Sequence, residues 1–175
     1  MTKPRTTFSY NALRKRIVAK LKETTETLRK IGYESQRISP REFYNYMTGE
    51  TPTGDTITIV DVLNNEFLMI HEIVEISELK KMGIPISKRT FMMLQPQMMY
   101  ETHYTATEYE FDYALHKGTF DWLKIRINHA KSWLEDDHMP QHLVPQYKAL
   151  VEKFSQILSK REQKTRTKDE LNTIL

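Results

Sequence analysis

Apolar residues recur every three or four positions along much of this chain, a spacing that predicts amphipathic helices. Over residues 8–31 the repeat is carried by Leu13, Ile17, Leu21 and Leu28, with Lys and Arg between them. Gly32 follows directly, and glycine is typical of the position just after a helix end. The segment therefore predicts a helix with one apolar side and a basic outer side.

A second, short helix is predicted to begin in the letters SPRE, residues 39–42. Ser39 suits the N-cap, Pro40 the first helical position, and Glu42 the position three after the cap, where a carboxylate can bond back to the cap. The loop TGETPTGD, residues 48–55, then interrupts the helical pattern.

Two long helices are predicted for the middle of the chain. The first covers residues 57–82 and ends before Gly83. Because residues 56–62 are rich in β-branched side chains, a short strand near 56–62 is the alternative there. The second covers residues 105–135, with Thr105 as its cap and a kink at Gly118.

A last helix is predicted near residues 144–161, and the polar segment 162–175 is predicted to be a frayed helix end or a tail. These elements predict an all-α fold in which residues 1–161 form a single-domain helical bundle. Helices 57–82 and 105–135 would form its centre.

Composition agrees with a water-soluble domain of ordinary balance. The chain has 175 residues, 39% hydrophobic and 28% charged, which is enough to bury a core. The absence of cysteine excludes disulfides and thiolate-based sites. No apolar stretch follows the basic N-terminus, and no run of 18 apolar residues occurs, so we expect a cytoplasmic protein without a membrane partner.

Charge is unevenly distributed, although the net charge is only +3. Residues 42–79 contain eight Asp or Glu and no Lys or Arg, whereas residues 1–41 are strongly basic. An acidic block of this kind requires a positive partner nearby. The sequence offers two, the basic first helix and a bound cation.

The stretch NNEFLMIHEIVEISELKKMG, residues 64–83, carries the candidate chemistry. With about 100° per residue, His71, Glu75 and Glu78 line one border of the apolar face. A His and a Glu four positions apart lie on adjacent turns and can hold one divalent ion. The alternative is a half-buried His that hydrogen-bonds to a carboxylate at a packed helix edge.

The five letters HEIVE within this stretch resemble the HExxH motif of zinc metalloproteases, with Glu75 in place of the second His. The resemblance implies that His71 and Glu75 are metal ligands and that Glu72 is the general base.

A third ligand is predicted at His129. On a continuous helix 105–135 it lies between Ile125 and Trp133 in the apolar stripe, where its ring nitrogens need polar partners. We therefore predict a divalent-metal-binding protein or metal-dependent hydrolase. Its ligands would be His71, Glu75 and His129, with Glu72 and Glu78 assisting catalysis. Such a donor set suits zinc, iron, manganese or nickel.

The alternative function is a non-enzymatic interaction module, either a homo-oligomer or a nucleic-acid-binding protein. Its contacts with phosphates would come from the basic first helix. The residues concerned are Arg14, Lys15, Arg16, Lys20 and Lys22. Motifs for dinucleotides, for the P-loop and for α/β-hydrolases do not occur in the sequence.

Overall fold

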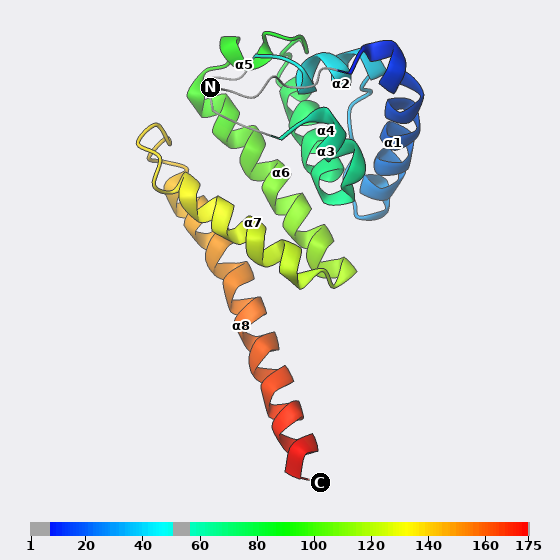
Figure 1. The fold of residues 1–175 in the computed structure, drawn as a ribbon. Coiled ribbons are helices and arrows are strands. Elements are labelled where there is room, and N and C mark those ends of the chain that lie inside the picture. The colour runs from blue at the N-terminus through cyan, green and yellow to red at the C-terminus, as the bar shows by residue number, and fades with distance from the viewer. Residues whose placement is uncertain (1–7, 51–56, 175) are drawn as a thin grey trace, which may run out of the picture. The chain divides into compact units, whose positions relative to one another are not determined.

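A computed structural model describes residues 8–50 and 57–174, with side chains described as far as residue 164. Within those residues it contains helices and no strand, which confirms the all-α fold (Figure 1). In chain order the helices are α1 (Tyr10–Lys30), α2 (Pro40–Met47), α3 (Ile59–Asn64), α4 (Glu66–Lys81), α5 (Thr90–Met93), α6 (Pro96–Lys117), α7 (Phe120–Trp133) and α8 (Val144–Ile174).

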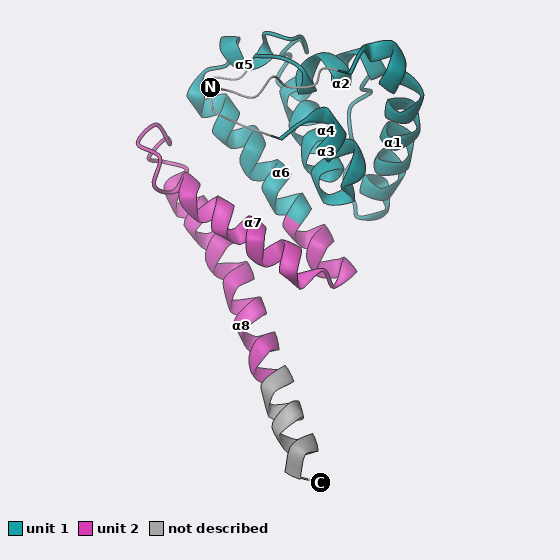
Figure 2. Cartoon of the chain, viewed as in Figure 1, with its two compact units in different colours: residues 1–110 teal, residues 111–175 magenta. Residues whose placement is uncertain are grey.

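The chain divides into two compact units, Met1–Glu110 and Phe111–Leu175, with the boundary inside α6 (Figure 2). The single domain proposed for residues 1–161 stays a prediction. The backbone of the polar C-terminal segment is helical as far as Ile174.

Helix α1 has the form that the apolar spacing predicts. Its buried residues include Leu13, Ile17, Leu21 and Leu28, and the Ser9 hydroxyl caps it by accepting from the Ala12 amide. Gly32 follows the helix with φ 87°, a left-handed conformation that glycine adopts without a steric cost. The buried side packs against α2, α3 and α4, so α1 forms one wall of the first unit.

Helix α2 begins with the predicted capping box. The Ser39 hydroxyl accepts from the Glu42 amide at 3.2 Å, and the Glu42 carboxylate accepts from the Ser39 amide at 2.7 Å. Glu42 also accepts from the Lys80 ammonium at 2.6 Å, which ties the start of α2 to the end of α4. Burial alone would raise the pKa of Glu42, but the hydrogen bonds from Lys80 and Ser39 outweigh it and hold that pKa below its usual value of 4.5.

The Glu42→Gln variant is expected to lose about 1 kcal/mol of stability at neutral pH, because the charged cap and the Lys80 ion pair are both weakened. A carboxylate with a lowered folded pKa stabilises above its unfolded pKa, and this contribution is lost as the pH falls through the folded value. Urea unfolding of both proteins, repeated at falling pH, should therefore show a difference that shrinks below about pH 4.5. A difference that does not change with pH would contradict this assignment.

The prediction of one long helix over residues 57–82 is wrong in one respect, because the helix is interrupted at Asn65. This residue has an extended backbone with φ −126° and ψ 116°, and its side-chain oxygen accepts from the amides of Phe67 and Leu68. It therefore ends α3 and caps α4. The alternative strand is also wrong for the described residues 57–62, since α3 begins at Ile59; residue 56 lies outside them.

Helix α4 is buried on almost every side, so it is the central helix of the first unit. Ile70, Ile73, Val74 and Ile76 are all at most 1% exposed although they point in different directions around the axis. The sequence predicts an amphipathic helix with a polar border at this place. In the structure, neighbouring side chains pack against this polar border as well. The side chain of Glu75 is therefore buried.

The second long helix, predicted for residues 105–135, is wrong at its start and at Gly118. Helix α6 already begins at Pro96, and the Thr105 hydroxyl donates to the Glu101 carbonyl inside that helix rather than capping an end. Gly118 has φ 72°, and the amide of Thr119 turns back to the Ala114 carbonyl at 3.0 Å. Helix α6 therefore ends at this point and α7 begins as a separate helix. The side chains of α7 point in other directions than they would on a continuous helix.

In the second unit α7 packs against α8. The buried side of α7 consists of Leu123, Ile127 and Ala130. Phe154 of α8 is fully buried and meets Phe111 edge to face at 5.2 Å. Among the helices of the described part of the chain, none combines the length and the apolar composition that a bilayer crossing requires.

Candidate metal centre

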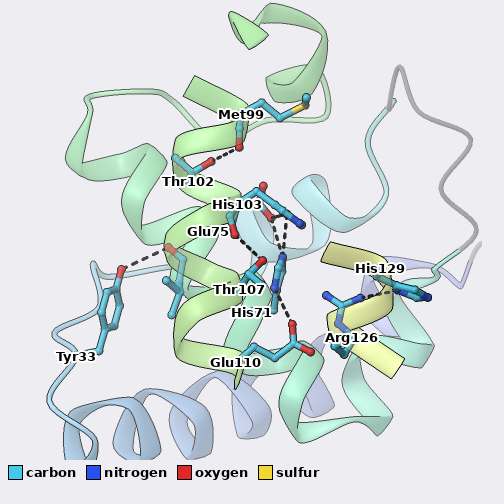
Figure 3. Close-up of polar contacts among 11 residues, drawn as sticks. Tyr33, His71, Glu75, Met99, Thr102, His103, Thr107, Glu110, Arg126 and His129 are labelled. Carbon is cyan, nitrogen blue, oxygen red and sulfur yellow. Dashed lines mark hydrogen bonds and ion pairs between the residues drawn. The ribbon is translucent and has the colours of Figure 1, made fainter. Parts of the chain in front are cut away.

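Two helices of the first unit, α4 and α6, direct imidazole and carboxylate side chains toward one another (Figure 3). His71 and Glu75 lie one turn apart on α4, and His103 and Glu110 lie two turns apart on α6. Residues at these spacings share a helix face, so each helix supplies one imidazole and one carboxylate.

The His71 ring connects the cluster through both of its nitrogens. Its Nδ1 lies 2.9 Å from a carboxylate oxygen of Glu110, and its Nε2 lies 3.1 Å from Nδ1 of His103. The Oε2 atom of Glu75 lies 3.6 Å from the same Nε2 and 4.0 Å from His103 Nδ1. Three potential ligand atoms, from His71, Glu75 and His103, therefore surround one point.

The cluster is almost completely removed from solvent. His71 is 3% exposed, Glu75 5% and Glu110 0%. The side chain of His103 is 16% exposed, so solvent reaches the cluster at this residue. Two carboxylates in such a setting are costly unless positive charge accompanies them.

The contact between the two imidazoles limits how much of that charge the histidines can provide. Two nitrogens at 3.1 Å form a hydrogen bond only if one of them carries a lone pair. His71 and His103 therefore cannot both be cations in this arrangement. With both carboxylates ionised, a single imidazolium leaves a net negative charge, whereas a divalent ion with two neutral imidazoles balances Glu75 and Glu110.

The distances also suit a small divalent ion. Four ligand atoms that surround zinc as a tetrahedron, each about 2.1 Å from the ion, lie about 3.4 Å from one another. The three pairwise distances among the ligand atoms of His71, Glu75 and His103 are 3.1, 3.6 and 4.0 Å. Displacements of a few tenths of an ångström would bring these atoms to tetrahedral spacing.

Glu110 has a different position, since it faces the far nitrogen of His71. A carboxylate that accepts from Nδ1–H fixes the tautomer and leaves the lone pair on Nε2, which points at the other two ligand atoms. Histidine ligands of metals commonly have such a carboxylate partner behind them. Glu110 therefore orients His71 without being a ligand itself.

Tyr46 of α2 lies next to this cluster and is 2% exposed. Its ring packs on Phe91 with centroids 4.7 Å apart. Burial raises the pKa of Tyr46 well above its usual value, and the nearby charges of Glu75 and Glu72 raise it further. Its hydroxyl lies close to the Glu75 carboxylate.

The structure brings together two of the predicted ligands, His71 and Glu75. The placement of His129 in a buried apolar stripe was wrong, because Gly118 resets the phase of α7 and turns Ile125 and His129 outward. His129 is exposed in the second unit and lies 3.2 Å from an Arg126 nitrogen, so it is not part of the group.

The two residues predicted to assist catalysis lie differently. Glu72 is half-buried, and its charge acts on Tyr46. Glu78 accepts from the Tyr33 hydroxyl and from the Lys81 ammonium, each at 2.7 Å. Burial and the hydrogen bond to Glu78 both raise the pKa of Tyr33. The group of His71, Glu75 and His103 does not include Glu78, and the predicted role of Glu78 in catalysis stays a prediction.

His103 is the residue that sequence reasoning missed. The helix predicted for residues 105–135 begins after His103, whereas α6 begins at Pro96 and includes this residue. Pro96 is the signal that was available, since proline favours the first turn of a helix. On a helix that begins there, His103, Thr107 and Glu110 follow at four- and three-residue steps and share a face.

The basic side chains of α1 are distributed over its outer side. Arg14, Lys15 and Lys22 are exposed, whereas Arg16 donates to the side chain of Asn64 and Lys20 pairs with Glu23 at 2.8 Å. The acidic residues Glu42 and Glu78 pair with Lys80 and Lys81 of α4 instead. Binding of nucleic acid through α1, and the homo-oligomer, stay predictions.

Comparison with known proteins finds no family model, no curated protein and no solved structure that matches this chain.

Proposed function

We propose that this protein binds one divalent transition-metal ion through His71, Glu75 and His103. The observation that carries the proposal is the convergence of these three ligand atoms within 4.8 Å of one another, in a buried part of the first unit. The charge balance with Glu75 and Glu110 supports a divalent ion, and the second carboxylate behind His71 supports a metal site with an oriented histidine.

Two nitrogens and one oxygen form a donor set that suits zinc best, and it also accepts iron, manganese and nickel. Three protein ligands leave a fourth position for water, which is the arrangement of catalytic rather than structural zinc sites. Bound to such an ion, water loses a proton near neutral pH and becomes a nucleophile. Hydrolysis is therefore the chemistry that we propose for the metal-loaded protein.

Access to the fourth position would come past His103, whose side chain is partly exposed while His71 and Glu75 are enclosed. Glu72 is the proton acceptor that the HExxH resemblance implies, and its half-buried position leaves it in contact with solvent. Glu110 would keep the His71 ring in a fixed orientation while Glu72 accepts the proton.

Metal analysis of two histidine variants tests the proposal. Wild-type protein is stripped with a chelator, reloaded with zinc, dialysed and measured by elemental analysis. We expect one ion per chain for wild type and less than a tenth of that for His103→Ala, because a ligand is lost. The matched control is His129→Ala, which removes an exposed imidazole from the second unit and should keep full stoichiometry.

Wild-type protein that holds no stoichiometric zinc, manganese, iron or nickel after reloading would contradict the proposal. Loss of metal from His129→Ala with retention by His103→Ala would support the ligand set expected from the sequence and contradict the one proposed from the structure. Circular dichroism of each variant shows whether the helices are retained.

A further inference from the structure

A cavity of about 480 Å³ lies in the first unit, where the loop after α1 meets α4 and α6. Its volume falls within the range of about 300–1,000 Å³ that is usual for small-molecule sites. The lining includes Tyr33 and Glu34 of the loop, Glu78 and Lys81 of α4, and Tyr109 of α6. None of the three proposed metal ligands is among the described residues that line it, so this pocket is separate from the metal centre.

The Glu78 carboxylate is the centre of the polar lining. Its Oε1 accepts from the Tyr33 hydroxyl and from the Lys81 ammonium, each at 2.7 Å, and the ammonium lies 3.3 Å from the same hydroxyl. Within the part of the chain that the structure describes, no protein group donates to the second oxygen, Oε2. This half-buried carboxylate can therefore accept a further hydrogen bond from a ligand in the pocket.

Two tyrosine rings favour positive charge in the pocket. Tyr33 and Tyr109 meet edge to face with their centroids 4.7 Å apart. The Lys81 ammonium lies 4.3 Å from the centroid of the Tyr33 ring, over the face that attracts cations. Lys81 is the last residue of α4 and its side chain is 38% exposed, so the side chain can turn into solvent. Its ammonium therefore marks a cation position that a ligand can occupy in its place.

We propose that this pocket binds a small organic cation with a primary ammonium group, independently of the metal centre. The ligand ammonium would replace that of Lys81, donating to the Glu78 carboxylate and lying over the Tyr33 ring. The charged residues of the lining are two carboxylates, Glu34 and Glu78, and one ammonium, Lys81. A cationic ligand balances this excess of negative charge, whereas an anionic ligand would increase it. A primary ammonium, unlike a quaternary one, also donates hydrogen bonds.

Titration of the full chain with cadaverine, 1,5-diaminopentane, tests the proposal, and 1-pentanol serves as an uncharged probe of similar length. A chelator is present throughout, so that no metal can bind the amine. We expect cadaverine to cause saturable changes in the amide NMR signals of residues 32–36 and 78–81, which belong to the segments around the pocket. The same concentrations of 1-pentanol should leave these signals unchanged.

Two variants of the pocket should change cadaverine affinity in opposite directions. Glu78→Gln should weaken binding about tenfold or more, because a charge-assisted hydrogen bond is lost. Lys81→Met should strengthen binding about two- to fivefold, because the ammonium that competes for the Tyr33 ring is removed. The matched control is Glu108→Gln, which removes a carboxylate beside Tyr109 in sequence but outside the lining, and it should keep the affinity of wild type.

Absence of saturable cadaverine binding, or equal binding of 1-pentanol, would overturn the proposal. Weaker or unchanged binding by Lys81→Met would also overturn it, because the ammonium would then not compete with the ligand. Circular dichroism shows whether Glu78→Gln is folded, and if it is not, the direction of the Lys81→Met effect decides alone. Because the chelator excludes metal from all of these measurements, their outcome is independent of the proposed metal site.

Discussion

The His71→Ala variant is expected to lose metal binding and to be destabilised by about 3 kcal/mol or more when metal-free. His71 is 3% exposed and Glu110 is 0% exposed, so the substitution removes the imidazole partner of a fully buried carboxylate and leaves a cavity. The lost partner of Glu110 and the cavity both lie in the interior of the first unit, where water cannot replace the missing contacts. Urea unfolding in the presence of a chelator measures the stability loss.

A second substitution at the same position separates the structural role from the metal-binding role. The His71→Asn variant keeps an N–H group near the position of Nδ1, which can still donate to Glu110, but it has no counterpart of Nε2. We expect it to recover a large part of the stability that His71→Ala loses while still failing to bind zinc. Equal stability of His71→Ala and wild type would contradict the assigned burial and the pairing with Glu110.

The second large effect is expected from two isoleucines of α7 that stand two positions apart. Ile127 is 3% exposed and Ile125 is 52% exposed. Ile127→Ala should cost about 2–5 kcal/mol, because it opens a cavity in a packed interior. Ile125→Ala should change stability by about 0.5 kcal/mol or less, since its side chain is largely in water already.

The same pair tests the phase of α7, since the two substitutions delete the same atoms. A helix that continued through Gly118 would bury Ile125 together with His129 and Trp133. Thermal unfolding of both variants, followed by far-ultraviolet circular dichroism, decides between the two phases. A larger loss for Ile125→Ala than for Ile127→Ala would contradict the break at Gly118.

Local signals in the sequence were sufficient for the first two helices. The bounds of α1 follow from its apolar spacing and from Gly32, and the start of α2 follows from the capping box of Ser39 and Glu42. These features depend on contacts between residues three or four positions apart, which any helical backbone brings together. They are therefore readable without knowledge of the rest of the chain.

The breaks at Asn65 and Gly118 were harder to predict because the apolar spacing continues on both sides of each. Asn65 caps the following helix with its side chain, and Gly118 adopts a left-handed backbone conformation. Either residue is tolerated inside a helix at modest cost, so the pattern alone does not require an interruption. The error at Gly118 then rotated every later residue of α7 and placed His129 in a core to which it does not belong.

The sequence by itself determined that this protein is helical, where α1 and α2 begin, and that His71 and Glu75 share one helix face, because these properties arise from near neighbours along the chain. Only the tertiary structure decided that His103 and Glu110 meet them. Residues 71 and 110 are far apart in sequence, and their contact depends on how α4 and α6 pack. Packing surrounds α4 with other side chains, and this burial turns a pair of polar residues at a helix border into a candidate metal centre.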